Sequence, residues 1–423
     1  VNGLSIESSD KALLESTIAA VKSGGEENKH TKQLARIASI NGYTSDLTVY
    51  ADTESFVGIL RKKAEQEGDG PGIVPVKPAA IMSALEIDEL KTAAVTFDMN
   101  ETRSNINFLL LHSPKPKGIL PAILRGTNSE VPNLSFLPST AQQVSVNRQS
   151  LAKIYDSLMD GLQKIGPMSA MITAGLTEME KKAGVNLRKD LFGSLDDTMA
   201  QAQTMKVGAD GLPEINQVTL LKLKNKARFE AALKTLVGMA GNGFPLFEES
   251  QINGQTIHTL KASLLGQGNQ QVAYAITNEY LIISRGSGDL LRKVLARIKS
   301  KTTTDSIWDA PTTQDALAQL PKGYTGMSVS DGASIMKFMA DLFTQVQNIA
   351  SGNMSGPQKG AKSQPKPGDA ADENEGGLEV IFDTKAVPGE DVFSRYFGIT
   401  VSGMYSEDDV TLIRVYSLPA KAK

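Results

Sequence analysis

The sequence predicts an α+β protein with two related lobes, each a mostly antiparallel sheet packed with helices and built from repeated β-α units. Runs of alternating apolar and polar residues come in pairs joined by short polar turns, which is typical of antiparallel hairpins. The stretch FLPSTAQQVSVNRQSL at 136–151 is repeated in layout by QLPKGYTGMSVSDGASI at 319–335. These observations favour repeated use of one folding unit over a parallel, doubly wound sheet.

The unit consists of a strand, a polar turn and a helix whose apolar residues follow the 3.6-residue period. It occurs five times, at 46–65, 144–158, 218–236, 280–298 and 327–342. In each copy a polar residue or glycine separates the strand from the helix, as helix starts require.

Specific residues form the turns and the apolar helix faces of these units. The first helix is capped by Asp52 or Thr53, and its apolar face is Phe56, Ile59 and Leu60, an arrangement typical of a helix packed on a sheet. In the third unit Asn225 forms the turn, and the helix face is Phe229, Leu233 and Leu236. Gly286 and Gly288 form the turn of the fourth unit.

Plain hairpins lie between these units. Residues 93–100 and 104–113 pair through a turn near Glu101 and Thr102. A strand at 256–262 precedes a strand pair within 271–284 that turns at Thr277 and Asn278, and the clearest hairpin, 400–418, turns through 406–409. Hairpins of this kind require antiparallel pairing.

The remaining helices are predicted at 9–22, 148–164, 167–184 and 331–350. The first has Leu13, Leu14, Ile18 and Val21 on one side and stops at a Gly-Gly pair. Residues 351–377 are rich in Gly, Pro and charged residues and nearly lack large apolar side chains, so we expect a disordered loop there.

The expected division of the chain follows from these elements. Residues 1–85 form an N-terminal helix and the first β-α unit, residues 86–205 a first lobe with a helical pair, and residues 206–350 a second lobe. The low-complexity loop at 351–377 follows, and residues 378–423 supply strands that complete a sheet.

Composition excludes several classes of protein. The net charge of −3 and a pI near 5.8 argue against a nucleic-acid partner. The absence of cysteine excludes disulfides, thiolate catalysis and cysteine-rich zinc sites. His30, His112 and His258 are the only histidines, and their spacing cannot form an H-E-x-x-H zinc site. We therefore expect no metal and no cofactor.

The sequence also bears on the compartment. No run of apolar residues reaches the roughly 18–20 needed for a transmembrane helix, so we expect no transmembrane segment in this chain. The chain begins at Val1 rather than Met, from which we expect a mature form whose signal peptide has been removed. We therefore expect the protein in the periplasm or outside the cell.

Ser-x-x-Lys is the sharpest catalytic pattern, and it occurs as Ser150–Lys153 and again as Ser334–Lys337. In one enzyme class such a lysine, one helical turn after the serine, activates it as a nucleophile. The accompanying S-D-N and K-T-G elements are missing. Because both serines stand at predicted helix starts, the favoured interpretation is helix capping, with the catalytic one retained as the weaker alternative.

Other candidate sites are weaker still. The turn SRGSGDLLRK at 284–293 has neither G-x-G-x-x-G nor a Walker ending. The acidic clusters 196–197, 248–249 and 407–409 lack the spacing of a calcium loop. His258 lies in a strand pattern, where a structural role is favoured, and one tryptophan, Trp308, is too few for stacked-aromatic recognition.

The order of motifs resembles a group of uncharacterised exported bacterial proteins. The resemblance is carried by DLFGSL, INQVTLLKLKNKARFEAALKTL, INGQTIHTLK and VAYAITNEYLIISRGSGDLLRKVL, and by the ending VPGEDVFSRYFGITVSGMYSEDDVTLIRVYSLP. It covers about residues 90–418, and its motifs are packing patterns. It implies an exported, envelope-associated protein and assigns no functional residues.

Three functional expectations follow. The leading one is a non-enzymatic binding or scaffolding protein of the bacterial cell envelope, with a protein or an apolar ligand as its partner. The alternative is a hydrolase with an unrecognised serine or carboxylate site, and the third is a subunit of a larger envelope assembly. The sequence predicts neither the ligand nor the oligomeric state.

Overall fold

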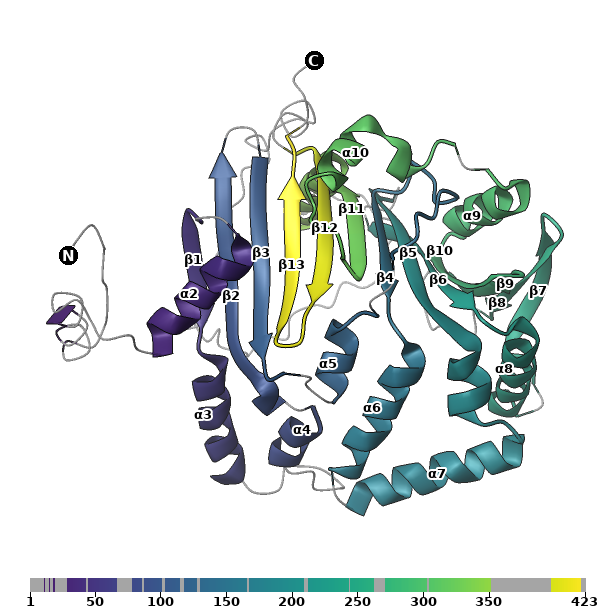
Figure 1. Cartoon of the computed structure of the whole chain (residues 1–423). Coiled ribbons are helices and arrows are strands. Elements are labelled where there is room, and N and C mark those ends of the chain that lie inside the picture. Colours follow the sequence, from purple (N-terminus) through teal and green to yellow (C-terminus); the bar gives the residue numbers. More distant parts are fainter. Residues whose placement is uncertain are drawn as a thin grey trace, which may run out of the picture.

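A computed structural model gives the structure of the chain (Figure 1). It describes residues 29–42, 45–66, 78–85, 87–100, 103–114, 118–127, 130–165, 167–208, 212–242, 244–261, 271–302, 304–350 and 397–419, together with Lys11, Glu15, Ile18 and Ala19.

The described residues form a single sheet of thirteen strands in the order β1-β2-β3-β13-β12-β11-β4-β5-β6-β10-β9-β8-β7. Every neighbouring pair is antiparallel. The strands are β1 (Leu47–Ala51), β2 (Leu90–Asn100), β3 (Arg103–His112), β4 (Gln143–Arg148), β5 (Leu195–Val207), β6 (Pro213–Leu223), β7 (Phe247–Ile252), β8 (Gln255–Leu260), β9 (Gln271–Ile276), β10 (Tyr280–Gly286), β11 (Gly326–Asp331), β12 (Ile399–Ser406) and β13 (Val410–Ser417).

Helices lie on both faces of the sheet and along one end of its strands (Figure 1). They are α2 (Lys29–Asn41), α3 (Thr53–Gln66), α4 (Pro78–Leu85), α5 (Ile119–Leu124), α6 (Leu151–Gln163), α7 (Pro167–Ala183), α8 (Lys226–Ala240), α9 (Asp289–Ser300), α10 (Pro311–Leu317) and α11 (Gly332–Ala350). Short helical turns are η1 (Ile87–Glu89), η2 (Leu187–Leu191), η3 (Phe192–Ser194) and η5 (Ile307–Asp309). No helix in the described part of the chain is both long and apolar enough to cross a membrane.

The two faces of the sheet differ in composition. Directly paired residues of neighbouring strands share a face, so the pairing register assigns each side chain. The first, which we call the α9 face, carries an apolar row across seven strands: Ile257, Ala275, Ile282, Leu220, Ala200, Val146 and Met327. The second, the α8 face, is polar in the middle strands and apolar towards β1: Tyr274, Ile283, Thr219, Gln201, Ser145, Ser328, Ser402, Val415, Ile106, Phe97 and Leu47.

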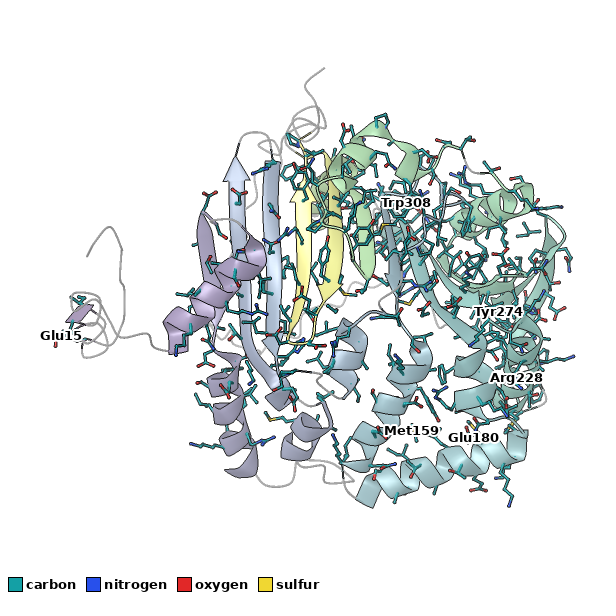
Figure 2. All side chains as sticks on the ribbon, viewed as in Figure 1. Glu15, Met159, Glu180, Arg228, Tyr274 and Trp308 are labelled. Carbon is teal, nitrogen blue, oxygen red and sulfur yellow. The ribbon has the colours of Figure 1, made fainter. Side chains whose placement is uncertain are left out.

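The main core lies on the α9 face, where α9, η5, α10 and the loop 131–141 cover the middle strands. Trp308 of η5 is 1% exposed, and its indole Nε1 donates to the Leu134 carbonyl oxygen at 3.3 Å. Figure 2 shows Trp308 beside α10. The sole tryptophan is therefore a core residue with its polar atom satisfied.

A second core on the same face lies under α2, at the β1–β3 end of the sheet. Ile37 of α2 packs with Leu109 and Leu412. Next to this cluster, Arg414 donates to Asn107 Oδ1 at 2.9 Å and to the Asn41 carbonyl oxygen at 3.0 Å. These hydrogen bonds hold α2 against the sheet, and they satisfy polar groups of the buried residues Asn41 and Asn107.

The structure confirms the α+β class, the three hairpins and all five strand–helix units. The helix pair is confirmed as α6 and α7, and the helix predicted at 331–350 as α11. The expected border at 205 falls inside β5. The expected loop at 351–377 lies outside the described residues. Of the helix expected at 9–22, four residues are described as helical, and Lys11 pairs with Glu15 at 3.8 Å.

The expected packing of the first helix face is wrong. Phe56, Ile59 and Leu60 of α3 are 58%, 65% and 38% exposed, whereas Val57 of the same helix is buried at 5%. The cap was predicted well, since Asp52 Oδ1 accepts from the Ser55 backbone amide at 3.2 Å. The helix therefore exists as predicted but turns its most apolar stripe to solvent.

The two repeated stretches are neighbours in the sheet. β4 and β11 pair with each other, and Ser145 lies opposite Ser328, with Val144 opposite Val329 and Val146 opposite Met327. Their valines face the same core. The repeated sequence therefore forms the middle of the sheet, and the helices that follow it, α6 and α11, leave the strand pair at opposite ends.

Candidate functional site

Ser150 is the N-cap of α6. Its Oγ accepts a hydrogen bond from the backbone amide of Lys153 at 3.3 Å, and the Lys153 side chain is exposed. A capping hydroxyl satisfies one of the free amides of the first helical turn. The capping interpretation of this serine is confirmed.

Ser334 does not cap α11. Its Oγ donates to Asp331 Oδ2 at 2.6 Å, and its backbone amide donates to Asp331 Oδ1 at 3.2 Å. Asp331 directly precedes α11 and is therefore the cap, because its carboxylate accepts from the first turn. The expectation of a capping serine is wrong for this copy, and Lys337 is exposed one turn further along the helix.

The two Ser-x-x-Lys pairs lie far apart. Ser150 follows the end of β4 and Ser334 follows the end of β11, and these strands are antiparallel. The serines therefore stand at opposite ends of one strand pair. Ser334 lines a polar cleft of about 430 Å³ together with Asp331, Lys206 and Lys293, among other residues.

The acidic pair Asp196–Asp197 forms ion pairs with Arg148 and Lys222. Asp197 lies 2.8 Å from Arg148 Nη2 and accepts from Thr127 Oγ1 at 2.5 Å. Burial opposes ionisation of Asp196, but hydrogen bonds with Asp197 and the charges of Lys222 and Arg148 outweigh it and lower the pKa of that carboxyl. Among the described residues, no group of three His, Asp or Glu side chains could hold a metal ion.

His258 lies in a cleft of about 650 Å³ between α8 and strands β7–β9. Its ring stacks on Tyr274 at 4.5 Å, and its Nδ1 lies 3.5 Å from Glu249 Oε1. Figure 2 shows Tyr274 on the α8 side of the molecule, above Arg228. Burial and the nearby Glu249 charge raise the pKa of Tyr274. The cleft mixes apolar and charged groups, with Lys226 paired to Glu230.

A second cleft, of about 540 Å³, lies at the same end of the sheet but beside α9. We call it the cationic cleft. Three local structures build it: the β7–β8 turn at Asn253 and Gly254, the β9–β10 turn at 277–279, and the last turn of α9. Asn253 and Gly254 both have positive φ, 54° and 77°, as a two-residue hairpin turn requires.

The floor of the cationic cleft is aromatic and apolar. Phe136 and Tyr280 meet edge to face with their ring centroids 5.4 Å apart, and Leu295 and Ile298 of α9 complete the floor. Arg297 fixes this floor, since it donates to the carbonyl oxygens of Phe136 at 2.8 Å, Ser135 at 3.0 Å and Thr304 at 2.7 Å. The arginine thereby joins the loop carrying Phe136 to the end of α9.

Two lysines stand at the rim. Lys299 and Lys301 are exposed, and neither ammonium has an ion-pair partner among the residues that the structure describes. Lys299 Nζ lies next to Gly254. If this glycine had a Cβ atom, that atom would lie 3.8 Å from the Lys299 Nζ. Lys301 holds the left-handed conformation, with φ 52°, that ends α9. Among the described residues that line the cleft, Glu279 is the single acidic one.

Tyr280 supplies a buried phenol to this cleft. The residue is 7% exposed and lines the cleft. Burial, together with the Glu279 and Asp196 charges, raises its pKa to about 12. The phenol therefore stays protonated and can donate a hydrogen bond to a bound oxygen.

Sequence reasoning missed the residues of the cationic cleft. Lys299, Lys301 and Tyr280 belong to ordinary helix and strand patterns, and only the pairing of distant turns brings them together. One signal was available: Asn253-Gly254 is the strongest short-range hairpin signal, and it would have located β7 and one wall of the cleft.

Comparison with protein-family models, with curated proteins and with solved structures finds no match for this chain.

Proposed function

We propose that this chain is a non-enzymatic binding protein of the bacterial cell envelope, and that its cationic cleft binds a small amphipathic anion. The ligand would combine an apolar or aromatic body with a carboxylate, phosphate or sulfate group. The observation that carries the proposal is the pair of rim lysines, Lys299 and Lys301, above the aromatic floor of Phe136 and Tyr280.

The cationic cleft has the properties that small-molecule binding sites share. Clefts of this size, with an apolar floor and a few convergent polar groups, bury most of a small ligand. Three cationic side chains against one acidic residue, Glu279, make the lining net positive, which favours an anion. The Tyr280 phenol, in a side chain that is 7% exposed, adds a hydrogen-bond donor to the lining.

Anilinonaphthalene sulfonate is a suitable probe, because it combines a fused aromatic body with one fixed negative charge. We expect its fluorescence to rise on binding to the native protein, and the double variant Lys299→Ala, Lys301→Gly to bind it about tenfold more weakly or worse. Circular dichroism of each variant checks that the probe reports on a folded protein.

Lys234→Ala is the matched control, since Lys234 lines the neighbouring cleft under α8. The proposal requires that this variant bind the probe as the wild type does. Loss of binding in Lys234→Ala with binding retained in the double variant would move the site to the α8 cleft. Equal binding by all three proteins would remove the proposal.

The location in the envelope is supported by the resemblance in sequence to exported bacterial proteins. Fractionation of cells that express the full-length gene product tests it. We expect the mature protein in the periplasm or the medium, and recovery in the cytosol alone would contradict export.

A hydrolase is the second candidate, because Ser334 lines a polar cleft that also contains Lys206 and Lys293. A fluorophosphonate label compared across the wild type, Ser334→Ala and Ser150→Ala tests this function. Labelling that disappears only in Ser334→Ala would establish a reactive serine, and the absence of labelling ends this candidate.

We further propose that the sheet consists of two copies of one six-strand unit, with bounds other than the lobes 86–205 and 206–350 predicted from the sequence, and that one copy is split between the two ends of the chain. One copy is β4-β5-β6-β10-β9-β8, and the other is β11-β12-β13-β3-β2-β1. Support comes from the strand order. Counted outward from the β4–β11 pair, the first three strands of each copy follow chain order and the next three follow reverse chain order. Further support comes from the register, since Ser145 opposes Ser328 at the centre.

Circular permutation tests this arrangement. Joining the chain ends and opening the chain at 128–129 makes both copies continuous, and we expect that protein to fold with a nearly unchanged melting temperature. Opening at 209–211 instead cuts the β5–β6 hairpin inside one copy, and we expect a clear loss of stability. Equal tolerance of both openings would contradict the proposed units.

A further inference from the structure

The exposed stripe of α3 lies at the end of the sheet opposite to the cationic cleft. Phe56, Ile59 and Leu60 follow the i, i+3, i+4 spacing of one helix side and are 58%, 65% and 38% exposed. On α4, which packs against α3, Ile81 is 43% exposed. In contrast, Val57 anchors α3 to the protein at 5% exposure. The helix is thus held in place with an apolar side turned outward.

Basic residues directly follow this stripe. Arg61, Lys62 and Lys63 come in sequence after Leu60, and Lys62 and Lys63 are exposed. Lys63 lies at i+7 from Phe56, so it continues the apolar side by one further turn. A long lysine stem at the end of an apolar stripe can keep its ammonium at a charged surface while the stem lies along apolar material.

We propose that α3 docks the protein on an anionic membrane surface, with Phe56, Ile59 and Leu60 inserted at the level of the acyl boundary. Interfacial helices bind in this way, with a modest apolar stripe and basic residues beside it. The charge decides between occupants: the exposed Lys62 and Lys63 complement anionic headgroups, whereas a second copy would bring the same cations against one another.

A second exposed apolar feature lies at this end. Leu47 and Val49 of β1, the strand that leads into α3, are 54% and 55% exposed. Exposed apolar groups on a strand and on the helix that follows it mark this end as an interaction surface.

Co-sedimentation with vesicles tests the proposal. We expect the wild-type protein to bind vesicles of equal parts phosphatidylcholine and phosphatidylglycerol and to bind pure phosphatidylcholine at least about tenfold more weakly. Ile59→Asp should reduce binding to the anionic vesicles about tenfold or more, since it places a charge at the acyl boundary. Lys62→Glu with Lys63→Glu should lower it several-fold, and added salt should lower the wild-type affinity.

Met171→Asp is the control, because Met171 of α7 is 66% exposed and lies outside the stripe. It should bind vesicles like the wild type, and melting curves should show that all variants remain folded. Failure of the wild type to bind the anionic vesicles overturns the proposal, as does unchanged binding by Ile59→Asp. Light scattering that finds a dimer dissolved by Ile59→Asp would assign the stripe to a second copy instead.

Discussion

The two ends of the sheet use similar strands in different ways. At the β8–β10 end helices pack on both faces: Ile282 under α9 is 0% exposed and Leu281 under α8 is 7% exposed, and Ile283, further along the α8 face, is 38% exposed. At the β1–β3 end α2 covers one face, where Leu109 is 2% exposed, but on the other face Phe108 is 45% and Val49 is 55% exposed.

This difference shows that apolar residues on both sides of a strand do not guarantee cover on both sides. At the β8–β10 end, several turns connect the strands and helices. The cationic cleft lies between these turns. The open end has few covering elements among the described residues and keeps apolar groups available for a surface. Binding of a small molecule and attachment to a membrane thus fit different ends of one sheet.

The strongest test of this comparison removes one buried side chain of the main core and one half-exposed side chain of the β1–β3 end. Trp308→Ala should destabilise the protein by about 3–5 kcal/mol, because it empties a fully buried site. Phe108→Ala should cost less than about 1 kcal/mol, because nearly half of that side chain is already in water. Urea unfolding followed by circular dichroism measures both, and similar losses would contradict the uneven cover.

The next largest effect on stability is expected at two arginines, Arg297 and Arg414. Each donates hydrogen bonds to an element that covers the sheet. Arg297→Met and Arg414→Met should each destabilise by about 1–3 kcal/mol, since each leaves part-buried acceptors without a donor. Only Arg297→Met should also weaken binding of the anionic probe, because Arg297 orders the cleft floor. Loss of probe binding in Arg414→Met, with the fold intact, would show that the ends are coupled.

A smaller effect is expected at Lys301. Its left-handed backbone suits glycine, so Lys301→Gly should leave stability unchanged or raise it by about 0.5–1 kcal/mol. The same change should weaken probe binding, because it removes a rim charge. A destabilised Lys301→Gly protein would indicate that the lysine side chain serves packing and not binding.

The smallest expected effect is a change in the stability of the folded protein at alkaline pH. The pKa of Tyr280 is raised from 10.0 to about 12 by burial, so the folded state holds the proton more tightly than the unfolded state. Its contribution to stability is present below pH 10 and is lost as the pH rises towards 12. Tyr280→Phe should therefore lose less stability than the wild type over this window, and parallel pH profiles would contradict a buried phenol.

Local patterns predicted most of the elements but not their arrangement. Asn225 and Asp52 were correctly placed at helix starts, because capping depends on a few neighbouring residues. The neighbours β3 and β13 come from distant parts of the chain, and no local signal specifies that pairing. The α3 stripe was assigned to packing for the same reason, since periodicity shows an apolar side without showing what covers it.

The site was harder still to predict. Ser150 and Ser334 share the Ser-x-x-Lys motif, but their roles differ. Ser150 caps α6, whereas Ser334 donates a hydrogen bond to Asp331, the residue that caps α11. The lysines of the cationic cleft share no motif. Lys299 gains its position from the end of α9 and from a hairpin turn some forty-five residues earlier, and such proximity follows only from the fold.

Hydrogen exchange with each of the two probes tests most directly whether the ends have separate functions. The anionic probe should slow exchange in the β7–β8 turn, the β9–β10 turn and the last turn of α9, and leave α3 unchanged. Anionic vesicles should slow exchange in α3 and leave those turns unchanged. Two separate regions of protection are the predicted result, and one shared region, or none, would contradict it.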